Sequence, residues 1–332
     1  MNMISPIKVT LLAITILASS YSWADCYFVD PSNNRLPSPL SPALNVSERL
    51  IPRDKAVGST DTAYAHGWDT IFTYCTSVMS AQTTAEISNG KLVPGYTNVY
   101  ETGIPGIGIQ FRAAVPGFSN TQLAPFSMSA SPDALIARVF NAGVTLVVTG
   151  PIQSGTADGS TLPTMTWRVT QGGARTSYVL RVNGILSVKG QTCKVSDSSI
   201  NVPMPQVMAK ELNKVGATAG DTKFSIDLNS CSPGLGVYVT LTDVSNPGNR
   251  SNIVSLTKSS TAQGIGYQVL RNSAPVNFGP DAATAGNPNQ WSAGQASGNS
   301  FSIPLVARYL RTSDAMQPGS VNGQLSFTMS YQ

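Results

Sequence analysis

The spacing of apolar residues is the feature that most constrains how this chain can fold. Apolar and polar residues alternate in short runs that end at Gly, Pro, Asn or Ser, and no segment has the spacing of a long amphipathic helix. Only 11% of the residues are charged, against about 25% in ordinary soluble domains. The pattern predicts an all-β chain. The clear strand candidates are Gly143–Thr149, Thr164–Thr170, Ser177–Val182, Gly236–Leu241, Ile265–Leu270 and Ser302–Tyr309.

Two segments depart from this pattern. Asp133–Asn141 is the one plausible short helix, although it fits a strand equally well. Asn277–Asn299 is rich in Gly, Ala and Asn and is predicted to be a long surface loop.

Composition excludes several kinds of function. The formal net charge is +4, and the sequence lacks the concentrated basic face of a nucleic-acid-binding protein, so no nucleic acid partner is expected. A chain with one histidine cannot build a multi-histidine metal site. We expect no metal and no cofactor.

Residues 1–24 have the features of a secretory signal peptide. Lys8 precedes the apolar run Val9–Ala18, and Ser22-Trp23-Ala24 offers small residues at the cleavage positions. A membrane anchor is the alternative, but this ten-residue run is too short for a bilayer that needs about 20 residues. We therefore expect an exported protein.

Four cysteines follow the signal segment: Cys26, Cys75, Cys193 and Cys231. An even number in an exported chain indicates disulfides, and four cysteines allow three connectivities. Local pairing, Cys26 with Cys75 and Cys193 with Cys231, is favoured because the two pairs lie far apart in the sequence. Each bridge would then stabilise its own half by about 4 kcal/mol. A metal site is disfavoured because no cysteine has a partner at zinc-finger spacing.

The cysteine pairs suggest two domains of the mature chain. We place a first domain at residues 25–188, a linker at 189–192 and a second domain at 193–332.

The last fourteen residues, Gly319–Gln332, alternate almost without fault. The period of two places one set of side chains on a single face of a strand, which we expect to face inward. This inward set is Val321, Gly323, Leu325, Phe327, Met329 and Tyr331.

The second half resembles a pilin domain of the bacterial chaperone–usher fimbriae. The resemblance rests on the order of several short features, each weak alone. They are Cys193 at the domain start, Cys231 after the strand Phe224–Ser230, the segments Gly264–Leu270 and Pro275–Gly279, Phe301–Thr312 followed by Pro318-Gly319, and the penultimate Tyr331.

The resemblance implies a sandwich that lacks its last strand. Such pilin domains are incomplete immunoglobulin-like sandwiches, and a strand from another chain fills a groove beside the terminal strand. Here the donor-strand groove would be lined by Val321, Leu325, Phe327, Met329 and Tyr331, with an opposite edge around Val195–Val207. The implied partners are a periplasmic chaperone, whose basic residues would meet the Gln332 carboxylate, an outer-membrane usher and an adjacent fimbrial subunit.

The first half resembles the receptor-binding domains of two-domain tip adhesins. Gly67–Cys75 and Ile104–Ile109 are similar to segments of the type 3 fimbrial adhesin group. Cys26 lies too close to the expected cleavage site to leave a free donor strand, so the subunit would accept a strand without donating one. The expected architecture is an N-terminal elongated β-sandwich adhesin domain plus a C-terminal incomplete immunoglobulin-like pilin domain. It would sit at the fimbrial tip on the bacterial cell surface.

A receptor site in the first half would combine aromatic rings for stacking with short polar side chains. The predicted ligand-binding residues are Tyr64, His66, Trp68, Asp69, Tyr96 and Tyr100, and the receptor would be a host glycan or an extracellular-matrix protein. An alternative is that Trp68 packs in the core near Cys75. The basic segment that holds Arg35, Arg49, Arg53 and Lys55 either attracts an acidic partner or is a solvated face.

Two other functions compete with a lectin-like adhesin. One is a structural tip or initiator subunit that has no receptor. The other is an exported glycan-active enzyme, for which two carboxylates in a cleft would be needed. Acidic residues are available at Asp69, Glu86, Glu101, Asp133 and Asp158, but no motif marks a pair. We therefore expect no catalytic residues.

Overall fold

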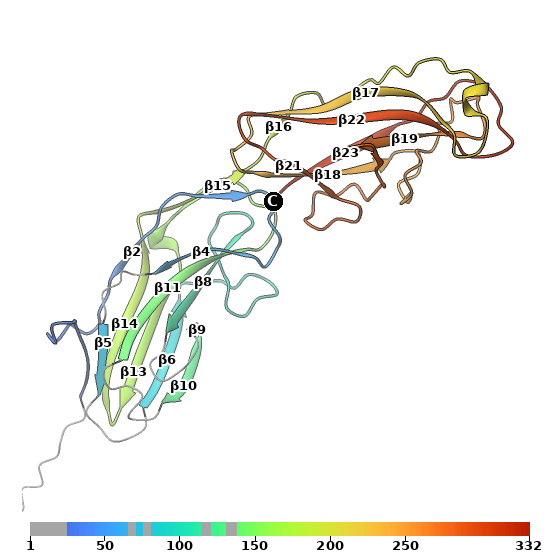
Figure 1. Ribbon diagram of the computed structural model, residues 1–332. Coiled ribbons are helices and arrows are strands. Elements are labelled where there is room, and N and C mark those ends of the chain that lie inside the picture. Colours follow the sequence, from blue (N-terminus) through green and yellow to red (C-terminus); the bar gives the residue numbers. More distant parts are fainter. Residues whose placement is uncertain (1–24, 66–70, 76–80, 115–120, 131–137) are drawn as a thin grey trace, which may run out of the picture.

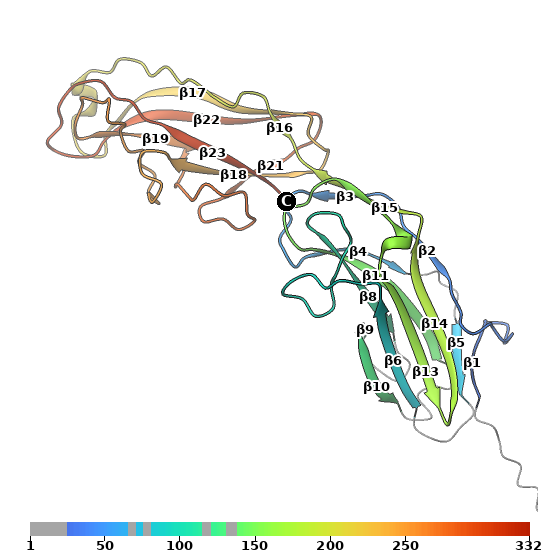
Figure 2. The same cartoon turned by 180° about the vertical axis from the view of Figure 1, so that it is seen from behind.

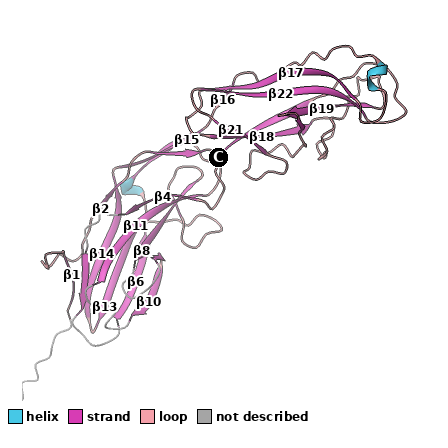
Figure 3. Cartoon of the chain, viewed as in Figure 1, coloured by secondary structure: helices cyan, strands magenta, loops and turns pink. Residues whose placement is uncertain are grey.

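The computed structural model describes residues 25–65, 71–75, 81–114, 121–130 and 138–332. The chain forms two elongated β-lobes that meet at an angle, and the C-terminus lies at the joint between them (Figures 1 and 2). Helical structure in the described residues is limited to the short turns η2 (Gly159–Thr161) and η3 (Ala209–Leu212) (Figure 3). None of the described helices is long and apolar enough to cross a membrane. The predicted all-β class is confirmed.

The N-terminal lobe is built from three sheets in the described part of the chain. The first has the order β1-β5-β11-β8-β7, with β4 added to β11 and β9 added to β8. Its strands are β1 (Cys26–Val29), β4 (Thr60–Ala65), β5 (Ile71–Cys75), β7 (Tyr100–Glu101), β8 (Ile107–Ala114), β9 (Thr121–Leu123) and β11 (Arg138–Val148).

The second sheet has the order β10-β6-β13-β14-β2, and the third has the order β12-β15-β3. The second contains β2 (Ala43–Asn45), β6 (Ala81–Ser88), β10 (Phe126–Ala130), β13 (Thr164–Gln171) and β14 (Ala174–Asn183). The third contains β3 (Arg49–Pro52), β12 (Gly155–Asp158) and β15 (Ile185–Gln191).

An aromatic cluster fills the interior of this lobe. Trp167 and Phe28 are fully buried, and their ring centroids lie 5.8 Å apart. The Trp167 indole N–H donates to the hydroxyl of Thr83 (2.7 Å), so its one polar atom is satisfied. The Cys26–Cys75 disulfide joins β1 to β5 at the side of this cluster.

The C-terminal lobe is a sandwich of a five-stranded and a three-stranded sheet, with orders β16-β17-β22-β19-β20 and β21-β18-β23. The larger sheet contains β16 (Lys194–Val195), β17 (Thr218–Asn229), β19 (Ile265–Arg271), β20 (Ala274–Pro275) and β22 (Ser300–Arg311). The smaller contains β18 (Gly236–Asp243), β21 (Trp291–Gln295) and β23 (Leu325–Tyr331). The second disulfide, Cys193–Cys231, completes the local pairing that the sequence favoured.

The structure corrects three details of the sequence-based expectations. Arg138–Asn141, the described end of the helix candidate Asp133–Asn141, belongs to β11, and residues 133–137 lie outside the described residues. The predicted loop Asn277–Asn299 contains β21, which pairs with β18, and Phe278 near its start is fully buried. The terminal strand begins at Leu325, because the preceding residues bond to the turn at 257–262 instead of to a strand.

The joint between the lobes is a continuous strand. Residues 189–191, expected to be a linker, continue β15 and pair in parallel with Leu50–Pro52 of β3. Of the two hydrophobic core clusters, one has Val188 as its last residue and the other has Cys193 as its first. We therefore propose that the first folding unit extends to Gln191.

A buried carboxylate organises the loop that follows β18. Asp243 is fully buried, and it accepts hydrogen bonds from the main-chain N–H groups of Ser245, Asn246 and Ser255 and from the Asn249 amide (2.8–3.2 Å). Burial opposes ionisation of the Asp243 carboxyl, but these hydrogen bonds outweigh it and lower its pKa.

Replacing this carboxylate tests its role. We expect Asp243→Asn to destabilise the C-terminal lobe by about 3 kcal/mol at pH 7, because an amide cannot accept the same set of hydrogen bonds. The pKa of Asp243 is lower in the folded state, so its stabilisation is complete above the unfolded value of about 3.9 and disappears as the pH falls through the folded value. Calorimetry of the full chain at pH 7 and at pH 3 measures both effects.

The exposed Asp221 provides the control, and Asp221→Asn should change the unfolding temperature little at either pH. A destabilisation by Asp243→Asn that is as small as the control's, or that is unchanged at pH 3, would contradict this account.

Candidate functional site

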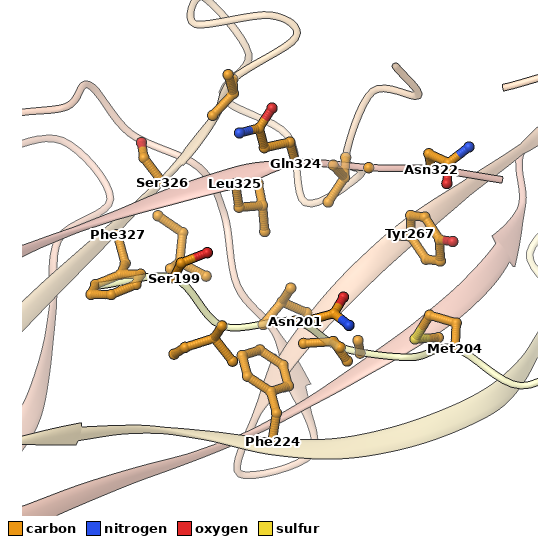
Figure 4. A pocket seen from close by; sticks show the side chains of 18 of the residues that line it. Ser199, Asn201, Met204, Phe224, Tyr267, Asn322, Gln324, Leu325, Ser326 and Phe327 are labelled. Atoms are coloured by element: carbon orange, nitrogen blue, oxygen red, sulfur yellow. The ribbon is translucent and has the colours of Figure 1, made fainter. Parts of the chain in front are cut away.

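The C-terminal lobe has a groove of about 870 Å³ that runs beside β23. It lies between the end of the chain on one side and the segment after β16 on the other (Figure 4). Most of the residues that line it are apolar, although polar atoms contribute much of its surface. The apolar lining residues are Val195, Ile200, Val202, Pro203, Met204, Phe224, Ile226, Leu241, Val244, Val254, Tyr267, Val269, Ala307, Tyr309, Val321, Leu325 and Phe327.

The alternation of β23 explains why apolar side chains reach this groove. Odd-numbered residues of the strand face the sandwich, and in Figure 4 Leu325 and Phe327 lie across the groove from Phe224 of β17. Leu325 and Phe327 are only half-buried, although their neighbour Met329 is buried. Apolar side chains that stay half-exposed above an apolar floor leave hydrophobic surface available to a further chain.

The main chain of β23 is open on the groove side. Gly236 and Gln332 exchange two main-chain hydrogen bonds (3.1 and 3.0 Å), and the Val244 N–H donates to the Gln324 carbonyl (3.2 Å). Even-numbered residues therefore bond to β18, and the N–H and C=O groups of Leu325, Phe327, Met329 and Tyr331 point away from it. Among the described strands, β23 pairs with β18 alone, so it is the edge of its sheet.

Two stacked tyrosines lie at the end of the groove that is distant from the joint, and each bonds to one of its rims. The rings of Tyr267 and Tyr309 lie 5.1 Å apart. The Tyr267 hydroxyl donates to the Val321 carbonyl on one rim (2.6 Å), and the Tyr309 hydroxyl donates to the Pro205 carbonyl on the other (3.2 Å). Burial raises the pKa of Tyr267, which keeps its hydroxyl a neutral donor. The pair fixes both rims, and sequence reasoning did not assign either residue to the site.

Glycines allow the rim beside β23 to approach its neighbours. A Cβ at Gly323 would lie 2.8 Å from Cδ2 of Tyr267, and a Cβ at Gly319 would lie 2.5 Å from the main-chain nitrogen of Ala262. Glycine is therefore required at Gly319 by a close backbone approach, which gives a physical reason for this part of the sequence pattern.

The residues predicted to line the groove fall into two groups. Val321, Leu325 and Phe327 line it. Met329 and Tyr331 lie beyond its end, and both are buried. The Tyr331 hydroxyl donates to the Cys193 carbonyl (3.0 Å), and burial raises the pKa of this phenol.

The predicted receptor-binding residues of the N-terminal lobe differ from one another in position and in burial. Tyr64 belongs to β4, and His66, Trp68 and Asp69 lie outside the described residues. Tyr96 is half-buried in the loop before β7. Tyr100 is buried in the core, and a Cβ at Gly90 would lie 2.6 Å from its ring, so this ring packs inside the lobe and is not exposed for stacking.

The basic side chains of the early segment all form ion pairs within the chain. Arg35 pairs with Asp25, Arg49 and Lys55 both approach Asp61, and Arg53 pairs with Asp54, at distances of 2.7–3.8 Å. These pairs favour a solvated, locally paired face over a basic surface for an acidic partner.

The described carboxylates that were considered for catalysis have structural partners. Glu86 pairs with Arg168, and Glu101 pairs with Lys91 (2.8 Å). Asp158 caps η2, and hydrogen bonds from the Ser160 N–H and hydroxyl lower its pKa. Asp69 and Asp133 lie outside the described residues.

Some known proteins are similar to the C-terminal part of this chain only, and others are similar to nearly its whole length. The family model described as "Fimbrial protein" matches residues 181–332. The F17c-G fimbrial adhesin of Escherichia coli is 38% identical over 146 residues, and the match covers 42% of this chain and 42% of that protein. A fimbria adhesin protein of Klebsiella pneumoniae is 24% identical over 98% of this chain and 99% of that protein. Among solved structures, the CupB6 tip adhesin of Pseudomonas aeruginosa is similar over 92% of this chain and 94% of that chain, at 17% identity and a TM-score of 0.38.

These matches agree with the family resemblance and with the exported, fimbrial localisation predicted from the sequence. Residues 181–332 match the fimbrial protein family model, and the chain is similar to fimbrial adhesins of Escherichia coli and Klebsiella pneumoniae.

Proposed function

We propose that this protein is an adhesive subunit at the tip of a chaperone–usher fimbria. Its C-terminal lobe accepts a β-strand from another chain, and its N-terminal lobe binds a receptor. The observation that carries the proposal is the open edge of β23 above an apolar groove, within the region that matches the fimbrial family.

The groove suits an extended strand better than a compact ligand. The N–H and C=O groups of Leu325 and Phe327 point toward it, so an added strand would gain main-chain hydrogen bonds. Apolar residues below the edge, such as Phe224 and Ile226, would receive alternate side chains of that strand. A periplasmic chaperone would supply the first such strand and an adjacent fimbrial subunit the final one, with an outer-membrane usher between the two steps.

The proposed receptor is a host glycan or an extracellular-matrix protein, in keeping with the adhesin relatives. Tyr64, His66, Trp68, Asp69 and Tyr96 remain the proposed binding residues. We remove Tyr100 from the set because it is buried. A structural tip subunit without a receptor is the remaining alternative, and the structural roles of Glu86, Glu101 and Asp158 do not favour an enzyme.

The first test places a charge in the groove. Phe327→Asp should reduce capture by the periplasmic chaperone of this fimbria at least about tenfold, because strand binding would bury an unpaired carboxylate. Affinity capture of the chaperone complex from periplasmic extracts measures this. Val215 is 48% exposed and does not line the groove, so Val215→Asp adds the same charge as a control and should leave capture unchanged. Equal capture of both variants would refute the groove as the strand site.

The second test separates an adhesin from a structural subunit. Residues 25–191 include the whole β3–β15 ladder, and we expect this fragment to fold with its disulfide intact. On arrays of glycans and matrix proteins, the fragment should bind at least one ligand class. His66→Ala should weaken that binding at least about tenfold, and Gln153→Ala, at an exposed residue, should not. A folded fragment that binds nothing would support the structural alternative.

A further inference from the structure

Two residues of the N-terminal lobe bind the open edge of β23 at its end. The Asp54 N–H donates to the Tyr331 carbonyl (3.0 Å), and the Tyr331 N–H donates to Oδ2 of Asp54 (3.0 Å). A guanidinium nitrogen of Arg53 donates to the Met329 carbonyl (3.3 Å). These acceptors and donors belong to the odd-numbered residues of β23, whose main-chain groups point toward the groove side of the sheet.

The contact is held firmly in the N-terminal lobe. The Arg53 N–H donates to the Gln191 carbonyl (3.0 Å), and its own carbonyl accepts from the Ile152 N–H (2.9 Å). The Arg53 guanidinium makes two hydrogen bonds to the Asp54 carboxylate, at 2.9 and 2.7 Å. The Asp54 side chain is 8% exposed, and the Arg53 side chain is 38% exposed.

The same guanidinium covers the ring of the penultimate residue. The Cζ atom of Arg53 lies 4.9 Å from the centroid of Tyr331, and the Tyr331 hydroxyl binds the Cys193 carbonyl. Tyr331 is therefore enclosed by the N-terminal lobe on one side and by the start of its own lobe on the other. A cation–π contact in a partly buried site adds to the hydrogen bonds.

We propose that Arg53 and Asp54 form a stop that ends the strand-accepting edge at Phe327. An incoming strand pairs with the main chain of Leu325 and Phe327 but not with Tyr331, whose N–H and C=O groups are already bonded to Asp54. The stop also fixes the receptor-binding lobe to the strand that lines the groove. This inference rests on the proposed strand-accepting function. It adds that the partner strand cannot pair with β23 beyond Phe327.

The chain contains a matched pair for comparison. Arg49 and Asp61 form an ion pair of the same residue types, with Nε and Oδ2 2.9 Å apart, inside the N-terminal lobe. Removing it should perturb the lobe to a similar degree without touching β23. Arg49→Ala/Asp61→Ala is therefore the control for Arg53→Ala/Asp54→Ala.

Hydrogen exchange of the full chain tests the stop directly. In the wild-type chain without added peptide, the Tyr331 amide should be protected, and in Arg53→Ala/Asp54→Ala it should exchange at least about tenfold faster. The amides of Ser330 and Gln332 face β18 and should stay protected in both proteins, which confirms that the lobe is folded. Unchanged Tyr331 exchange in the double variant, with Ser330 and Gln332 protected, would overturn the stop.

Peptide binding tests whether the stop limits how far an added strand can pair along β23. Two synthetic peptides of alternating Val and Thr are used, one sized to pair with Leu325 and Phe327 and one about four residues longer, enough to reach Tyr331. The wild-type and control proteins should bind both with similar affinity. Arg53→Ala/Asp54→Ala should bind the longer peptide about tenfold more tightly than the shorter one, a difference of about 1.4 kcal/mol.

The outcomes separate this inference from the proposed function. A longer peptide that already binds about tenfold more tightly to the wild-type chain would overturn the stop and leave the groove standing as a strand site. Failure of both peptides to bind any of the proteins would count against the strand-accepting function, and Tyr331 exchange would then decide whether the interdomain contact exists.

Discussion

An unpaired strand edge above an apolar groove is the feature on which the rest of this structure depends. An edge strand with half-buried Leu325 and Phe327 has exposed hydrogen-bonding groups and exposed hydrophobic surface together. Such an edge readily pairs with other chains and, when left open, promotes aggregation. Most proteins shorten, twist or cover edges of this kind. The proposed function gives this edge a role, because another strand would pair with its main chain and cover the floor of the groove.

The two ends of the groove are controlled by different chemistry. At the distant end, the hydroxyl groups of Tyr267 and Tyr309 donate hydrogen bonds to the two rims. At the joint, the ion pair of Arg53 and Asp54 occupies the last main-chain groups of β23. The proposed strand-accepting edge is thereby bounded at both ends by residues that are distant from one another in sequence. The N-terminal lobe takes part in this definition, so the joint between the lobes is more than a flexible tether.

The sequence predicted the parts of the fold that depend on local pattern. Strict alternation in Gly319–Gln332 placed Leu325 and Phe327 on the correct face, and cysteine spacing favoured the pairing that is found. The local sequence pattern could not predict contacts between distant segments. The bonds between Asp54 and Tyr331 join residues 277 positions apart, and no periodicity encodes them. Composition misled at Asn277–Asn299, where a Gly-rich segment contains β21, which pairs with β18, and Phe278 is buried.

The most direct test supplies the missing strand in the same chain. A donor strand of alternating apolar residues is fused after Gln332 through a flexible linker, and calorimetry compares the unfolding of the C-terminal lobe with and without it. The account predicts a clear rise in the unfolding temperature and a monodisperse monomer, because the strand would cover the edge and the groove together. An unfolding temperature and a tendency to aggregate that are unchanged by the added strand would contradict the account.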